Sequence, residues 1–219
     1  MYKLAIFDFD GTLVDSAPGI VTVMEQVALE YNLPTQIVDD WKNLIGVPLV
    51  KQMQTVLPDK NEEYWTQVAE RYRAIYDQQT IEICPPFPFL KDMLAKLTKN
   101  DIKISIASSK RRHLIEEVLA YHNLLDYFCL VIGAQDVNNH KPHPESVQIT
   151  LSNLNINYQE AVVIGDSTYD LEMARNANVD SIGVTTGIHT RQILHTAGPR
   201  FVADNLNEVL DLILNGRKI

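Results

Sequence analysis

The chain is poor in cysteine and in basic residues, and each shortage argues against a class of protein. Only two cysteines, Cys84 and Cys129, occur among 219 residues, and their spacing fits neither a disulfide framework nor a thiolate zinc site. Lys and Arg number 19 against 28 Asp and Glu, which gives a formal net charge of −9. Because nucleic-acid-binding surfaces are strongly basic, this balance argues against a nucleic-acid partner.

Membrane and export signals are also missing from the sequence. No apolar run approaches the roughly 20 residues that span a bilayer. No charged leader with a cleavage site precedes the first apolar run. We therefore expect a cytoplasmic protein that makes no membrane contact, with both cysteines reduced. Apolar residues make up 46% of the chain, which is enough to bury a sizeable core.

What the chain does contain begins with an apolar run that ends in acidic residues. Residues 4–8 are typical of a buried strand, and Asp8, Asp10 and Gly11 stand at its carboxyl end. Side chains two apart in an extended segment point the same way, so Asp8 and Asp10 can face one site. Two such carboxylates repel each other and need a cation or a proton nearby. Taken alone, Asp8-Phe9-Asp10 is explained more simply as a polar turn.

Helical patterns fill the next part of the chain. Residues 16–80 show helical apolar spacing and contain no convincing strand. A proline-rich stretch, residues 84–88, cannot be a regular helix and is typical of a linker. We therefore predict a helical domain over residues 16–80, inserted into a core domain of residues 1–15 and 81–219.

Strands and helices alternate after the linker. The predicted strands are residues 102–107, 128–132, 161–164, 181–184 and 201–202, with helical segments between them. This alternation predicts an α/β fold, a Rossmann-like parallel sheet with helices on both faces. In such a sheet the functional site lies at the carboxyl ends of the strands.

Polar side chains stand at these strand ends. Ser108 follows the strand at 102–107, Asp166 follows the strand at 161–164, and Lys141 lies in the loop after the strand at 128–132. Each alone has a plainer reading, since Ser108 and Asp166 could cap helices and Lys141 could be solvated. Together with Asp8 and Asp10, all at one predicted edge, they indicate a common site.

This pattern resembles a known family. Its motifs are Asp8-x-Asp10-Gly11-Thr12, Ser108 after its strand, Lys141-Pro142-x-Pro144-Glu145 and Gly165-Asp166-Ser167-x-x-Asp170. They resemble the four motifs of the haloacid-dehalogenase-like phosphohydrolases, and the helical insert resembles that superfamily's small cap. The pattern is most similar to the phosphoglycolate phosphatase and β-phosphoglucomutase branch. The dehalogenases lack the second Asp, so Asp10 favours phosphoryl chemistry.

The resemblance implies a role for each motif residue. Asp8 would bind a metal with one oxygen and attack phosphorus with the other, forming an aspartyl-phosphate. Asp10 would bind the metal through its backbone carbonyl and act as general acid and base through its side chain. Asp166 would complete the metal shell. Oxygen ligands without His or Cys indicate Mg²⁺.

Other residues would hold the phosphoryl group or support the site. The resemblance gives Ser108 and Lys141 the phosphoryl oxygens. Thr12 and Ser109 are further candidates for phosphate contacts or for support of the metal shell. Asp170 would either support that shell or orient Lys141.

Substrate choice is expected in the inserted domain. Residues 46–52 resemble the specificity loop of the cap, with Gly46 and Lys51 as candidates. Lys51 could meet an anionic leaving group, although a solvated helix lysine fits the pattern at least as well. A glycine commonly follows the Pro-aromatic-Pro of the second hinge in such relatives, and Phe89 stands there in this chain.

We therefore expect a Mg²⁺-dependent phosphatase that acts on a small phosphorylated metabolite, with phosphoglycolate as the first substrate to try. A β-phosphoglucomutase-type mutase and a pyrophosphatase are alternatives on the same core. A non-catalytic binding module on this fold is an alternative of a different class. Either a monomer or a homodimer is compatible with the sequence.

Overall fold

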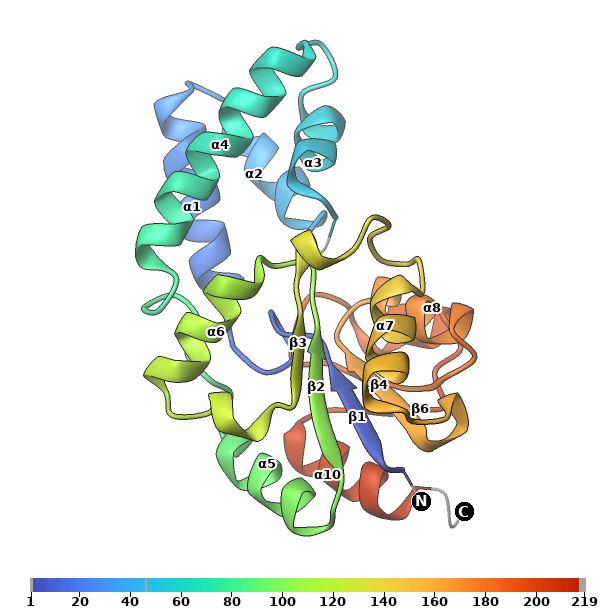
Figure 1. Cartoon of the computed structure of the whole chain (residues 1–219). Coiled ribbons are helices and arrows are strands. Elements are labelled where there is room, and N and C mark those ends of the chain that lie inside the picture. The colour runs from blue at the N-terminus through green and yellow to red at the C-terminus, as the bar shows by residue number, and fades with distance from the viewer. Residues whose placement is uncertain (1, 46, 217–219) are drawn as a thin grey trace.

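The computed structural model of the chain describes residues 2–45 and 47–216. Its described part contains a parallel sheet of six strands in the order β3-β2-β1-β4-β5-β6 (Figure 1). The strands are β1 (Leu4–Phe7), β2 (Lys103–Ala107), β3 (Leu130–Ile132), β4 (Ala161–Gly165), β5 (Asp180–Val184) and β6 (Phe201–Ala203). The predicted α/β fold is confirmed. The strand order reverses beside β1, where ligands bind in sheets of this kind.

Strand β1 lies at the centre of the sheet and is buried on both faces. Its neighbours are β2 and β4, and Phe7 is in register with Ile106 and Ile164. Alternate side chains pack into different cores, with Ala5 and Phe7 on one face and Leu4 and Ile6 on the other. Burial on both faces explains why this strand is continuously apolar in the sequence.

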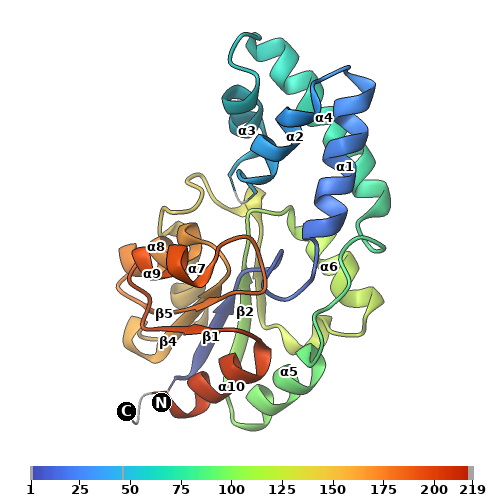
Figure 2. The same cartoon turned by 180° about the vertical axis from the view of Figure 1, so that it is seen from behind.

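Helices cover both faces of the sheet (Figures 1 and 2). They are α5 (Leu90–Lys99), α6 (Arg112–Tyr121), α7 (Glu145–Leu154), α8 (Thr168–Asn176), α9 (Arg191–Thr196) and α10 (Leu206–Asn215). Helices α5, α6 and α10 contribute to one core, while α7 and α8 contribute to the other. Helix α9 was not expected from the sequence. It has only 6 residues and buries only Leu194, so it shows no apolar period in the sequence. The Thr190 hydroxyl caps it.

A separate helical bundle lies beyond the upper end of the sheet in Figure 1. It consists of α1 (Ala17–Glu30), α2 (Thr35–Lys42), α3 (Leu49–Val56) and α4 (Glu62–Gln79), and we call it the cap. Trp41 is fully buried inside it and donates its indole N–H to Gln52 Oε1 at 2.6 Å. None of the helices in the described residues is both long and apolar enough to cross a bilayer.

Two connections join the cap to the sheet, and they lie side by side. The Asp15 N–H donates to the Pro85 carbonyl at 2.8 Å, and the Phe87 N–H donates to the Leu13 carbonyl at 3.0 Å. Phe89 follows with φ of 72°, in the left-handed region that costs a side chain about 1 kcal/mol or more. A glycine would adopt this conformation freely, so Phe89 carries a strain that the glycine common at this hinge would avoid.

Candidate active site

Carboxylates gather at the carboxyl edge of the sheet. Asp8 follows β1 and Asp166 follows the neighbouring β4, so the sheet register brings them together. Asp170 lies one turn into α8 and joins them. One oxygen from each of the three lies within 4.8 Å of the others, which is close enough for the three carboxylates to share one metal ion.

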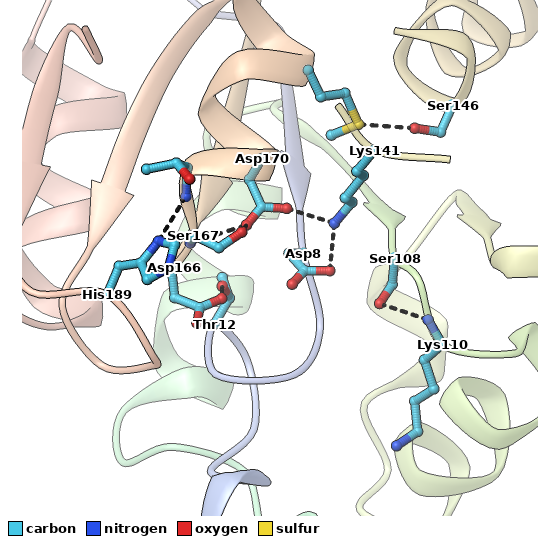
Figure 3. Close-up of polar contacts among 12 residues, drawn as sticks. Asp8, Thr12, Ser108, Lys110, Lys141, Ser146, Asp166, Ser167, Asp170 and His189 are labelled. Atoms are coloured by element: carbon cyan, nitrogen blue, oxygen red, sulfur yellow. Dashed lines mark hydrogen bonds and ion pairs between the residues drawn. The ribbon is translucent and has the colours of Figure 1, made fainter. Parts of the chain in front are cut away.

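Lys141 lies inside this acidic cluster (Figure 3). Its ammonium donates to Asp8 Oδ1 at 2.7 Å and to Asp170 Oδ1 at 2.6 Å, and its side chain is only 7% exposed. The loop that carries it is folded around Glu145, whose two carboxylate oxygens accept the Asn138 and Asn139 N–H groups. Lys141 is therefore a buried ion-pair partner and not a solvated loop lysine.

Asp170 has two structural tasks. Its Oδ1 holds Lys141, while its Oδ2 accepts from the Ser167 N–H at 3.1 Å and from the Ser167 hydroxyl at 2.6 Å. These bonds cap α8, so Asp166 is not the residue that caps this helix. Of the two roles considered for Asp170, the geometry fits the orientation of Lys141.

Asp166 is held by the backbone and by a buried hydroxyl. Its Oδ1 accepts from Thr12 at 3.2 Å and its Oδ2 accepts from the Ile188 N–H at 2.9 Å. Two glycines make room for this carboxylate, because a Cβ at Gly11 or Gly187 would lie 2.6 or 1.9 Å from Asp166 Oδ2. Thr12 is fully buried and faces Asp166 (Figure 3), so its geometry fits support of the metal shell and not a phosphate contact.

Protonation in the cluster follows from burial. Burial raises the pKa of Asp8 to about 6, although the Lys141 ammonium opposes this effect. Burial, Asp170 and Asp8 together raise the pKa of Asp166 well above its usual range. Burial alone would lower the pKa of Lys141, but Asp170 and Asp8 hold it above its ordinary value. Three carboxylates share one ammonium, so a divalent cation among these hard oxygen ligands would relieve the excess negative charge.

A cavity of about 420 Å³ opens between this edge and the cap. From the sheet side it is lined by Asp8, Asp10, Ser108, Ser109 and Lys141, among others. From the cap it is lined mainly by apolar and aromatic side chains, including Met24, Val47, Leu49 and Tyr72. The acidic cluster therefore faces a space large enough for a small metabolite.

Ser108 belongs to this lining and does not cap a helix. Helix α6 begins at Arg112, and Arg111 is its N-cap residue. The Ser108 hydroxyl instead accepts from the Lys110 N–H at 3.3 Å at the end of β2. It lies beside the cavity, where a phosphoryl oxygen could be held.

Comparison with known proteins decides the family. The model of the haloacid dehalogenase-like hydrolase family matches residues 5–184. The chain belongs to this family. The resemblance carried by the four motifs is confirmed, and the protein is an enzyme of a hydrolase family.

Relatives of this haloacid dehalogenase-like hydrolase match nearly their whole length. A protein of Dickeya dadantii named "Probable phosphatase IndB" is 34% identical over 96% of this chain and 93% of its own. A phosphoglycolate phosphatase of Vibrio vulnificus is 30% identical over 97% of this chain and 96% of its own. A crystal structure of a haloacid dehalogenase-like hydrolase from Bacteroides fragilis superposes with a TM-score of 0.90 at 31% identity, covering 95% of this chain and all of that one.

Gly46 and Lys51 are the two cap residues that the sequence suggested for substrate specificity. Gly46 is outside the described residues. Lys51 is exposed on α3 and does not line the cavity. The next residue, Gln52, is buried, lines the cavity and donates to the Val47 carbonyl at 2.6 Å. Successive helix residues point about 100° apart, so Lys51 turns toward solvent while Gln52 faces the cavity.

Two residues of this site are not evident from the sequence. Lys110 lines the cavity and is buried beside Asp10. His189 lies beside Asp166 and accepts the Thr168 N–H at 3.0 Å through Nδ1, and burial lowers its pKa (Figure 3). Lys110 stands in a Ser-Ser-Lys-Arg-Arg run typical of a solvated basic loop. No sequence signal distinguishes it from Arg111 and Arg112.

Proposed function

We propose that this protein is a Mg²⁺-dependent phosphatase that hydrolyses a small phosphorylated metabolite through an aspartyl-phosphate on Asp8. The observation that carries the proposal is the Lys141 ammonium, which bridges Asp8 and Asp170 beside Asp166 at the cavity. The two curated relatives described above are both named phosphatases, which supports hydrolysis over phosphoryl transfer to a sugar.

Substrate binding follows from charge. Lys141 and Ser108, with Ser109 beside them, would hold the oxygens of the transferring phosphoryl group. The carboxylates of Asp8 and Asp166 and the backbone carbonyl of Asp10 would hold Mg²⁺. When bound, Mg²⁺ neutralises the charge between the phosphate and the acidic cluster, and this lets the anionic substrate approach.

The reaction then needs two steps on this chain's residues. In the first, an Asp8 oxygen forms a bond to phosphorus while the ester P–O bond breaks, and Asp10 gives its proton to the departing alkoxide. In the second, Asp10 takes a proton from water, the water oxygen bonds to phosphorus, and the bond to Asp8 breaks. Inorganic phosphate leaves, and both aspartates return to their starting states.

The cap would bind the leaving group. We place the cap domain at residues 16–80 and the core at residues 1–15 and 81–219, with the paired segments around Asp15 and Pro85 as hinge. Arg111 of the core forms an ion pair with Asp77 of α4, and both residues line the cavity. Closure of the cap would exclude water during the first step, and its opening would admit water for the second.

The test is phosphate release from a panel of phosphoglycolate, sugar phosphates, nucleotides and pyrophosphate. The expected result is release in Mg²⁺ that a chelator stops, with one clearly preferred monoester. Isomerisation of β-glucose 1-phosphate without phosphate release would instead assign the mutase. No reaction with any compound would favour the non-catalytic binding module.

A further inference from the structure

Lys110 is a buried lysine at the point where the sheet, the cap and the linker meet. It lies in the loop between β2 and α6, and its side chain is only 5% exposed. Its ammonium lies 3.4 Å from Asp10 Oδ1 and 3.5 Å from Cys84 Sγ, and it donates to the Tyr76 hydroxyl. The same ammonium lies 4.2 Å from the centre of the Tyr76 ring.

The charges around this ammonium single out Asp10. Burial raises the pKa of Cys84 and the pKa of Tyr76, so the thiol and the phenol are neutral at physiological pH. Of these three contacts, only Asp10 can carry a negative charge, and in the proposed reaction it does so once its proton has passed to the leaving group. A buried ammonium is strongly held by such a partner, because separation would leave it unpaired away from water.

The site already has residues for the phosphoryl group. Lys141 is paired with Asp8 and Asp170, and Ser108 lies beside the cavity. Lys110 contacts neither Asp8 nor the acidic cluster among the described interactions; its ion pair is with Asp10. Its effect on the reaction would therefore pass through the Asp10 side chain.

We propose that Lys110 is a positioning residue that holds the Asp10 side chain toward the leaving-group oxygen. The inference rests on the proposed function, because it assumes that Asp10 moves the proton. Asp10 comes directly before the turn at residues 11–13 and is 21% exposed, so its carboxylate needs a fixed partner to keep one orientation. Tyr76 belongs to cap helix α4 and Cys84 to the linker, so Lys110 also ties the orientation of Asp10 to the position of the cap.

A structural role and a positioning role differ in their dependence on the leaving group. An alkyl phosphate such as phosphoglycolate needs a proton on its departing oxygen, whereas 4-nitrophenyl phosphate releases a stable phenolate that does not. If Lys110 acts only by positioning Asp10, its loss should slow the first turnover of the alkyl phosphate and leave that of 4-nitrophenyl phosphate unchanged. General damage to the site should slow both.

The experiment measures the rate of the first turnover in the Lys110→Met variant. Lys110→Gln replaces it if Lys110→Met folds poorly. We expect the phosphoglycolate rate, or that of the best alkyl phosphate in the panel, to fall about 10- to 100-fold. The burst of 4-nitrophenolate should stay close to wild type, and Lys110→Arg should recover part of the alkyl phosphate rate. Lys96→Met is the matched control, because Lys96 also lies over an aromatic ring, that of Phe89, but away from the site.

Each outcome has a distinct meaning. Equal losses on both substrates, or unchanged rates on both, would overturn the positioning role while leaving the phosphatase in place. A wild-type enzyme that releases phosphate from neither substrate would overturn the proposed function itself, and this inference with it.

Discussion

At the scale of single residues, the proposed reaction depends most directly on Asp8. Its side chain is only 13% exposed, its pKa is raised to about 6, and Lys141 is its counter-charge. Asp8→Asn keeps the shape of this side chain but removes the proposed nucleophile. We expect turnover to fall by at least about 10³-fold while the fold is kept, since Lys141 still has Asp170. Phosphate release and circular dichroism measure the two effects, and full activity in this variant would reject the mechanism.

Thr12 allows a second test at this scale. Its buried hydroxyl donates to Asp166 Oδ1, so Thr12→Val removes this support and leaves the shape nearly unchanged. Loss of such an outer contact typically weakens metal affinity by about 10- to 100-fold. A Mg²⁺ titration of activity measures the change.

Thr22→Val is the control for this prediction, because the Thr22 hydroxyl only bonds to the Pro18 carbonyl on an exposed part of α1. An unchanged Mg²⁺ dependence in Thr12→Val would show that the hydroxyl does not support the metal site.

At the scale of elements, the loops after the strands determine how closely the backbone approaches the site. The loop after β5 carries Gly187, where a Cβ would lie 1.9 Å from Asp166 Oδ2. Gly187→Ala must therefore displace the carboxylate or the loop. We expect weaker Mg²⁺ binding and a turnover that is lower by at least about 10-fold. Calorimetric titration measures the first effect and phosphate release the second.

Gly198→Ala is the control for the loop. Gly198 has φ of 69°, but a Cβ there would meet no atom within 4 Å. That variant should lose about 1 kcal/mol of stability from backbone strain and keep its Mg²⁺ affinity. Normal Mg²⁺ binding in Gly187→Ala as well would contradict the role assigned to this close approach.

The same scale shows what sequence patterns predict well. The strands expected at residues 102–107 and 161–164 lie within one residue of β2 and β4, because continuous apolar runs bounded by turn residues are typical of buried strands. Helix α9 escaped prediction because its stability depends on one cap and one buried leucine. Short elements of this kind carry too few residues to form a pattern.

At the scale of the whole molecule, stability should depend on pH and on the metal together. The folded state binds the Asp8 proton with a pKa of about 6, against an ordinary value of 3.8 for the carboxyl group. In chelator, this proton's stabilising contribution is complete below about pH 4 and is lost as the pH rises through about 6. Ionisation of buried Asp8 then costs folding free energy, which bound Mg²⁺ would offset.

The measurement is thermal unfolding of wild type and Asp8→Asn between pH 4.5 and 7.5, with chelator and with Mg²⁺, because the difference between the two proteins isolates Asp8 from other acids. In chelator, wild type should lose stability relative to Asp8→Asn as pH rises, and Mg²⁺ should reduce that loss. A pH-independent difference in chelator would contradict the raised pKa.

The sequence by itself determined the family, the parallel sheet and the strand ends at which Asp8, Ser108 and Asp166 stand. It could do so because carboxyl ends of parallel strands meet at one edge, so local patterns were enough. Tertiary structure alone decided that Thr12 faces Asp166, 154 residues away, and that Lys110 is buried against Asp10, 100 residues away. It also decided that Gln52 faces the cavity while Lys51 faces solvent. These outcomes depend on contacts between distant segments, and such contacts leave no periodic pattern in the chain.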